Sequence, residues 1–125
     1  MKPLAVAFLE AAEEDLAAAR RLLPDLPRPA AYHLQQAAEK LAKSELARGG
    51  AVLVPRSHDI GYLAGLLPPD HPLAASLAAL ADLTEFSVTT RYPAWAGELA
   101  RPPDPEGLEQ RAGTLEELLQ GARRR

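Results

Sequence analysis

The chain has 125 residues, of which 47% are hydrophobic, 25% charged and 5% aromatic, and its formal net charge is −3. This length predicts one domain over residues 1–125, and the negative charge disfavours a protein that binds nucleic acid through bulk positive charge. Because cysteine is absent, disulfide scaffolds, thiolate metal sites and a cysteine nucleophile are excluded, which favours an intracellular protein.

Apolar residues form no run long enough to span a membrane, and the pattern of a secretory signal is missing. We therefore expect a cytoplasmic protein without a membrane partner. Asparagine is absent, methionine occurs once and proline 12 times. Loss of thermolabile residues and proline-rich connections is typical of thermophiles, although a GC-rich genome would also enrich proline. We expect a thermophilic source.

Four long helices and one short helix are predicted. From Leu4 to Leu23, apolar residues recur at spacings of three and four, which indicates an amphipathic helix. The proline-rich stretch 24–29 ends this helix. The second helix is predicted to begin at Pro29, where proline suits the first position, and to end at Arg48 before two glycines.

The two middle helices are predicted from shorter signals. The short third helix covers 58–67, with Ser57 as its cap. The fourth covers 72–91, with Asp70 or His71 as its cap and Pro72 in the tolerated first turn.

The last predicted helix begins at Pro105, with Asp104 as its cap, and ends in the arginines 123–125. No segment has the alternation of a strand. These elements predict an all-α fold, an antiparallel up-and-down four-helix bundle with one additional short helix. Because alanine-rich stripes bury little apolar area, self-association would add stability, and we expect a homodimer or tetramer.

The predicted fourth helix changes character along its inward face. In steps of three and four, this face carries Leu73, Leu77, Leu80, Thr84, Ser87 and Arg91. The change from aliphatic to polar residues predicts a polar pocket near that end of the helix. An inward arginine needs acceptors, which Asp15 or Glu45 could supply. The alternative is that the helix frays before Arg91 and leaves this side chain in solvent.

Two aromatic residues follow Arg91. Tyr92 and Trp95 could stack on a base, which would fit a nucleotide site built from a guanidinium group and rings. The alternative for Trp95 is an anchor that packs the irregular segment 93–103 against the bundle.

The second helix carries a polar face. Gln36, Glu39, Lys40 and Lys43 lie at helical spacing, on the side opposite Leu34, Ala38 and Leu41. One interpretation is a solvated face with a Glu39–Lys43 pair. The other is a subunit interface or a surface that recognises anions.

This helix carries the resemblance to a known family. The segment 31–43, Ala-Tyr-His-Leu-Gln-Gln-Ala-Ala-Glu-Lys-Leu-Ala-Lys, resembles the signature of HEPN domains. Three further elements agree in order, and they are Asp15-Leu16 followed by Ala19, His58-Asp59-Ile60, and Thr90-Arg91-Tyr92-Pro93. Together they span most of the chain, and their combination is specific although each alone would be weak.

The resemblance implies an all-α up-and-down bundle, often oligomeric and often encoded beside a small nucleotidyltransferase in a toxin–antitoxin-like module. It also implies a nucleotide or RNA ligand, since many members are metal-independent ribonucleases. Those members carry an arginine followed, after four to six residues, by a histidine at the dimer cleft. Here no histidine follows Arg91. We therefore expect a non-catalytic or nucleotide-binding component with no cofactor.

Two alternatives stay open. A ribonuclease could use a relocated histidine, His33 or His58. Arg28 and His33 do form an Arg-x4-His pair, but away from the expected place, and Ser57-His58-Asp59 is also typical of a helix cap. The second alternative is a helical oligomeric adaptor that binds a protein through the polar face of the second helix. The three histidines lack metal-ligand spacing, so we expect no metal.

Overall fold

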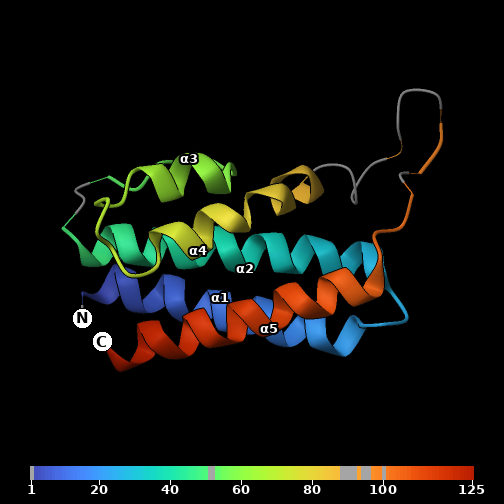
Figure 1. The fold of residues 1–125 in the computed structure, drawn as a ribbon, viewed down its shortest axis with the longest axis horizontal. Coiled ribbons are helices and arrows are strands. Elements are labelled where there is room, and N and C mark those ends of the chain that lie inside the picture. The colour runs from blue at the N-terminus through green and yellow to red at the C-terminus, as the bar shows by residue number, and fades with distance from the viewer. Residues whose placement is uncertain (1, 51–52, 88–92, 94–96, 100) are drawn as a thin grey trace.

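The computed structural model describes residues 2–50, 53–87, 93, 97–99 and 101–125. Its elements, in chain order, are α1 (Pro3–Leu22), α2 (Pro27–Arg48), α3 (Ile60–Gly65), α4 (Ala74–Ala79), the 3₁₀ helix η1 (Ala81–Ser87) and α5 (Pro105–Arg124). Every regular element among these described residues is helical, which confirms the predicted all-α fold (Figure 1). None of the described helices is long and apolar enough to cross a membrane.

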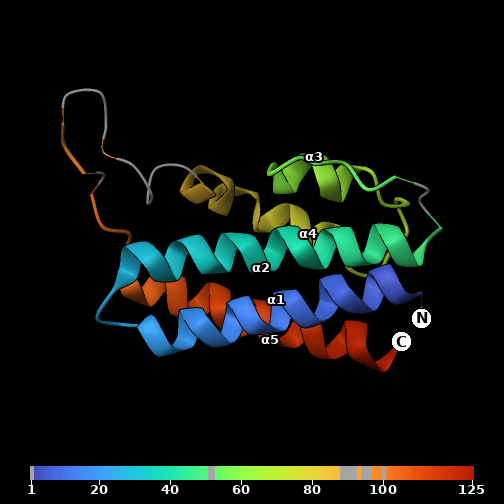
Figure 2. The ribbon, with the colours of Figure 1, turned by 180° about the vertical axis from the view of Figure 1, so that it is seen from behind.

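The long helices alternate in direction. α1 and α2 lie antiparallel, α4 and η1 together run back along α2, and α5 returns toward the N-terminus, so that both ends of the chain lie at one end of the bundle (Figures 1 and 2). α3 packs outside this arrangement, against α2, α4 and η1. The predicted up-and-down bundle with one additional short helix is therefore confirmed, with α4 and η1 jointly forming the fourth helix.

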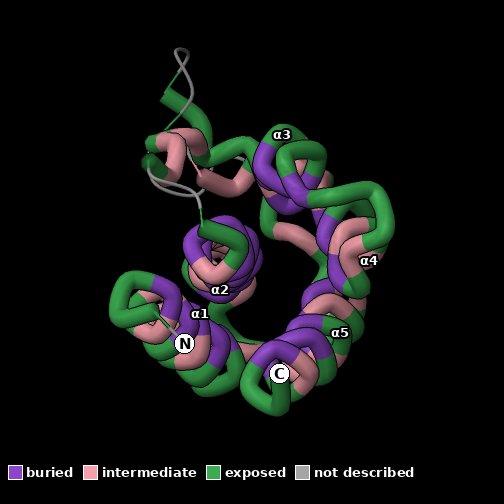
Figure 3. The backbone as a smooth tube through the Cα atoms, turned by 90° about the vertical axis from the view of Figure 1, so that its left-hand side faces the viewer, coloured by how far each residue is buried: buried purple, intermediate pink, exposed green. Residues whose placement is uncertain are grey.

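The second helix lies in the middle of the bundle. It contacts α1, α3, η1 and α5, and most of its residues are buried, as the purple of α2 in Figure 3 indicates. Its buried residues include polar and charged ones, and these are Gln35, Glu39, Lys43, Ser44 and Glu45. Because buried polar groups need partners, α2 must exchange hydrogen bonds and ion pairs with its neighbours.

The fourth helix differs from the prediction. Instead of one α-helix over 72–91, α4 ends at Ala79, and η1 continues as a 3₁₀ helix to Ser87. The buried leucines of this region, Leu77, Leu80 and Leu83, are three residues apart. Residues at this spacing stay in line along a 3₁₀ helix, whereas along an α-helix they drift gradually around the axis. The 3₁₀ turn from Leu80 to Leu83 therefore keeps Leu83 on the same buried side as Leu77 and Leu80. The end of the predicted helix, 88–91, lies outside the described residues.

Three helix starts refine the predictions. α2 begins at Pro27, before the expected start at Pro29. The cap of α3 is Asp59, whose side chain accepts a hydrogen bond from the Tyr62 amide at 3.1 Å, while Ser57 accepts one from the Asp59 amide at 3.0 Å. Asp104 caps α5 as predicted, through the amide of Glu106.

The fourth helix has no side-chain cap of the predicted kind. Its N-cap position is Leu73, and neither Asp70 nor His71 fills it. His71 instead accepts a hydrogen bond from the Leu73 amide at Nδ1, at 3.0 Å. This contact fixes the turn that leads into α4.

Candidate functional site

Three carboxylates bind the three histidines of the chain. Each pair joins α2 to a different element, and the pairs are Asp15–His33, Glu39–His58 and Glu45–His71. The histidines differ in what their second ring nitrogen does, and this difference decides which of them could act chemically.

Glu39 is the centre of the first cluster. Its carboxylate accepts hydrogen bonds from Lys43 Nζ at 2.9 Å, from His58 Nδ1 at 2.8 Å and from Gln35 Nε2 at 3.1 Å. Gln35 Nε2 also lies 3.2 Å from the carbonyl oxygen of His58, and Gln36 donates to Gln35 Oε1. The cluster therefore ties the segment before α3 to the middle of α2.

The pKa of Glu39 reflects two opposing effects. Burial is the larger single influence and raises the pKa, but hydrogen bonds from Lys43, His58 and Gln35 together outweigh it. The pKa of Glu39 therefore lies below its ordinary value of 4.5. The carboxylate is ionised at neutral pH and holds a stable negative charge inside the protein.

Asp15 forms a second cluster between α1 and α2. One oxygen of its carboxylate lies 2.8 Å from His33 Nδ1, and the other accepts from Lys40 Nζ at 2.6 Å. The Tyr32 ring meets His33 edge to face, at 5.4 Å between centroids. The structure thus brings together Asp15, His33 and Lys40, which the sequence had assigned to three different roles.

Glu45 lies in a third cluster near the chain ends. Its side chain is fully buried, and it contacts His71 Nε2 at 3.0 Å, Arg125 at 2.5 Å and Arg48 Nε at 3.7 Å. Arg48 also donates to the carbonyl oxygen of Ala122 at 2.7 Å. These contacts fasten α2 to the end of α5 and to the turn before α4, so they hold the bundle closed.

The predicted polar face of α2 needs one correction. Glu39 and Lys43 are not solvated, because α3 and η1 pack against α2, and the two residues are only 4% and 8% exposed. Gln36 and Lys40 stay partly exposed. The expected Glu39–Lys43 pair is confirmed. An adaptor surface made of all four side chains is therefore wrong.

The predicted nucleotide pocket is described only in part. Arg91 and Tyr92 lie outside the described residues. Thr84 is half-buried, and its hydroxyl accepts a hydrogen bond from the Ile60 amide at 3.1 Å. Ser87 is the last residue of η1. Leu73, Leu77 and Leu80 are buried as the predicted stripe requires, and Leu83 is buried as well. Thr84 and Ser87 are half-buried, so the polar end of the stripe, at Arg91, stays a prediction.

Sequence reasoning missed the role of Gln35, which bonds to both Glu39 and His58, and the pairing of Glu45 with His71. For the pairing of Glu45 with His71 the sequence held a signal, because Glu45 falls on the apolar stripe of α2 and a carboxylate on such a face needs a hydrogen-bond donor. The donors come from distant parts of the chain, which no local pattern reveals.

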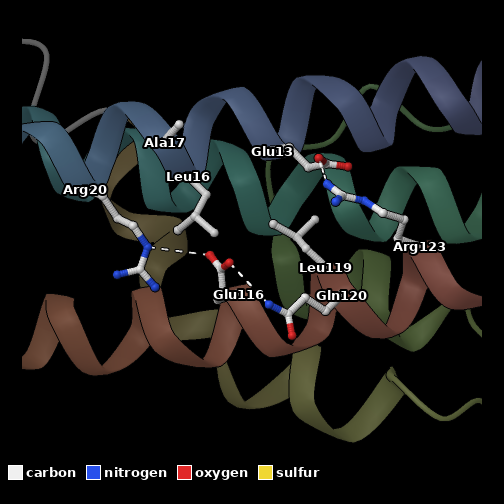
Figure 4. A pocket seen from close by; sticks show the side chains of 8 residues that line it. All are labelled: Glu13, Leu16, Ala17, Arg20, Glu116, Leu119, Gln120 and Arg123. Carbon is white, nitrogen blue, oxygen red and sulfur yellow. Dashed lines mark hydrogen bonds and ion pairs between the residues drawn. The ribbon is translucent and has the colours of Figure 1, made fainter.

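A groove of about 280 Å³ runs between α1 and α5. Leu16 and Leu119 line it, and charged side chains cross it in pairs (Figure 4). Arg20 lies 3.6 Å from Glu116, and Arg123 pairs with Glu13. Because these charges neutralise one another across the seam, they join the first helix to the last. Among the described residues, no group of three or more metal-ligating side chains is present.

The fold and the clusters together describe an all-α bundle whose second helix carries the buried polar residues Gln35, Glu39 and Lys43. Glu39 bonds to His58, which lies just before the short helix α3. The sequence model of the HEPN domain family matches residues 5–124. The chain therefore belongs to the HEPN domain family.

A solved structure is similar over nearly the whole chain. It is described as the crystal structure of TT1696 from Thermus thermophilus, shares 30% sequence identity and has a TM-score of 0.75. The match covers 93% of this chain and 93% of that one. A comparison with curated proteins gave no match.

Proposed function

We propose that this HEPN domain protein is the nucleotide-binding component, without ribonuclease activity, of a cytoplasmic two-protein module in which a separate nucleotidyltransferase is its partner. The module would resemble a toxin–antitoxin pair. The observation that carries this proposal is the bonding of residues in the HEPN signature: Glu39 accepts hydrogen bonds from Gln35, Lys43 and His58. Residues bonded to one another in this way are not free to bind a nucleotide phosphate, and Arg91 is the candidate group for that contact.

Arg91 suits an anionic ligand because a guanidinium group binds phosphate through two parallel hydrogen bonds. Tyr92 next to it offers a ring for a base. No histidine follows Arg91 in the sequence, so the arginine lacks the proton-transfer partner of the ribonuclease members. Binding without cleavage is what this composition supports.

Nucleotide binding is tested by calorimetric titration of the purified chain with ATP and with a short RNA. Arg91→Ala is expected to lower the affinity at least tenfold, since a charge-assisted contact contributes about 1.5–3 kcal/mol. Arg101→Ala is the matched control, because Arg101 is exposed and lies in the same connecting region. Equal affinities of the two variants would contradict a ligand site at Arg91.

An RNA-cleavage assay in EDTA separates this proposal from the ribonuclease alternative. We expect no cleavage by the wild type, by Arg91→Ala or by His33→Ala. Cleavage by the wild type that His33→Ala or His58→Ala abolishes would replace the proposal with a relocated catalytic histidine. Co-purification of a nucleotidyltransferase with the tagged chain from its native cells tests the partner.

A further inference from the structure

The three histidine–carboxylate pairs leave different atoms available. Nδ1 of His71 accepts a hydrogen bond from the Leu73 amide, so its hydrogen sits on Nε2 and is donated to Glu45. Both ring nitrogens of His71 are therefore occupied, and its side chain is 15% exposed. This histidine is structural.

His58 has the opposite arrangement. Its Nδ1 lies 2.8 Å from Glu39, and its side chain is 65% exposed. An ionised carboxylate only accepts hydrogen bonds, so Nδ1 carries a hydrogen. Whenever the ring carries a single hydrogen, Nε2 therefore keeps its lone pair. Within the described residues Nε2 has no partner. The residue is also held through its backbone, since Gln35 donates to the His58 carbonyl oxygen.

Glu39 adds the feature that activates this ring. A carboxylate behind an imidazole fixes the tautomer and stabilises the positive charge that develops when Nε2 forms a bond. Glu39 is nearly buried and is itself held by Lys43 and Gln35. His33 also contacts a carboxylate, but its side chain is less exposed, at 37%.

We propose that Glu39 and His58 form a nucleophilic site, in which Nε2 of His58 accepts an acyl group from an activated acyl donor and Glu39 is the positioning residue. The proposal goes beyond the proposed function and does not depend on nucleotide binding or on a transferase partner. Acyl donors fit better than phosphoryl donors because the cation of the cluster, Lys43, already pairs with Glu39. A phosphoryl dianion would need further positive charge, whereas a neutral acyl group needs none.

The reaction balances without an added co-reactant. The Nε2 lone pair bonds to the carbonyl carbon of the donor, and the bond from that carbon to the leaving oxygen breaks with its electron pair. The acylated ring then loses its Nδ1 proton to water, which leaves a neutral acylimidazole. Water then attacks the acylimidazole carbon, releases the acid and restores the neutral ring.

The test uses the full chain and diethyl pyrocarbonate, an acyl donor that labels neutral imidazole. Mass spectrometry after digestion measures the labelling rate of each histidine. We expect His58 to react first, His33 more slowly and His71 least. Labelling of His33 or His71 ahead of His58 would overturn the proposal.

Variants then assign the role of Glu39. Glu39→Gln is expected to lower the labelling rate of His58 about tenfold, and Glu39→Asp to restore part of it. Asp15→Asn, the matched change at the other exposed pair, should leave the His58 rate unchanged. An unchanged His58 rate in Glu39→Gln would overturn the positioning role. The His71 rate monitors folding, because unfolding would expose it.

If Glu39→Gln unfolds the chain, Gln35→Ala replaces it, since this variant keeps the Glu39–Lys43 pair. It should slow labelling of His58 without raising that of His71, and an unchanged rate would contradict the proposal. Hydrolysis of p-nitrophenyl acetate supplies the catalytic readout. We expect His58→Gln to abolish the protein-dependent turnover and His33→Gln to keep it, and the reverse result would overturn the site.

Discussion

Glu39 shows how one buried residue combines charge with structure. Three donors from two parts of the chain meet at its carboxylate, and they keep it ionised despite burial. A buried ion pair of this kind contributes less to net stability than its contacts suggest, since both charges lose water. Removing one partner is costly, however, because the other charge stays behind.

The lowered pKa of Glu39 predicts a pH dependence of stability. When the pH falls below 4.5, the ordinary pKa of this residue, Glu39 binds a proton in the unfolded chain. In the folded chain Glu39 stays ionised down to a lower pH, because its pKa is lowered. The stabilisation is therefore present above pH 4.5 and is lost as the pH falls through the lower folded pKa. Urea denaturation between about pH 7 and about pH 3 should show a steeper loss of stability for the wild type than for Glu39→Gln.

The control for this measurement is Glu117→Gln, because Glu117 lies on the exposed face of α5. Its stability curve should run parallel to that of the wild type. If the curve of Glu39→Gln also ran parallel to that of the wild type, Glu39 would not carry the predicted linkage.

At the scale of the elements, the break between α4 and η1 is the feature that places the core. Side chains three residues apart stay in line along a 3₁₀ helix, whereas along an α-helix they drift gradually around the axis. The chain adopts the 3₁₀ geometry around Leu80, whose amide bonds to the Leu77 carbonyl at 3.0 Å and whose own carbonyl accepts from Leu83. This geometry turns Thr84 toward the start of α3.

Leu83→Ala tests this geometry. Because Leu83 is fully buried, the substitution should lower the free energy of unfolding by about 3 kcal/mol. Thr84→Val, which removes the acceptor of the Ile60 amide, should cost about 1 kcal/mol. Leu66→Ala is the control, since Leu66 is 44% exposed. A small effect at Leu83 together with a large one at Thr84 would favour a continuous α-helix.

At the scale of the whole molecule, the fold presents a narrow strip of α2 to solvent. Gln36 and Lys40 are its partly exposed members from the predicted polar face, and Lys40 pairs with Asp15 of α1 at 2.6 Å. If Gln36 and Lys40 belong to a subunit interface, the predicted homodimer or tetramer assembles through this strip. Light scattering on the purified chain measures the assembly.

Lys40→Glu is expected to weaken the assembly to monomers while leaving the helix content unchanged. The variant also places two carboxylates together, which destabilises α1 against α2. The double variant Asp15→Lys, Lys40→Glu restores that pair and separates the two effects. If the single variant dissociates and the double variant does not, the loss came from the fold and the strip is not an interface.

Local patterns in the amino-acid sequence were enough to locate most of the helices. Proline and glycine punctuation, apolar spacing and the cap at Asp104 act within a few residues, and the HEPN signature in α2 was readable for the same reason. The helical spacing also placed Gln36, Glu39, Lys40 and Lys43 on one face. The family match over residues 5–124 agrees with that signature.

The roles of these residues followed instead from contacts between helices. Glu39 meets His58 across 19 positions, and Glu45 meets His71 across 26, because α3 and the turn before α4 fold back on α2. The same packing buries Glu39 and Lys43, which a helical wheel leaves in solvent. Burial and long-range pairing depend on how whole helices pack, and no pattern within one helix contains that information.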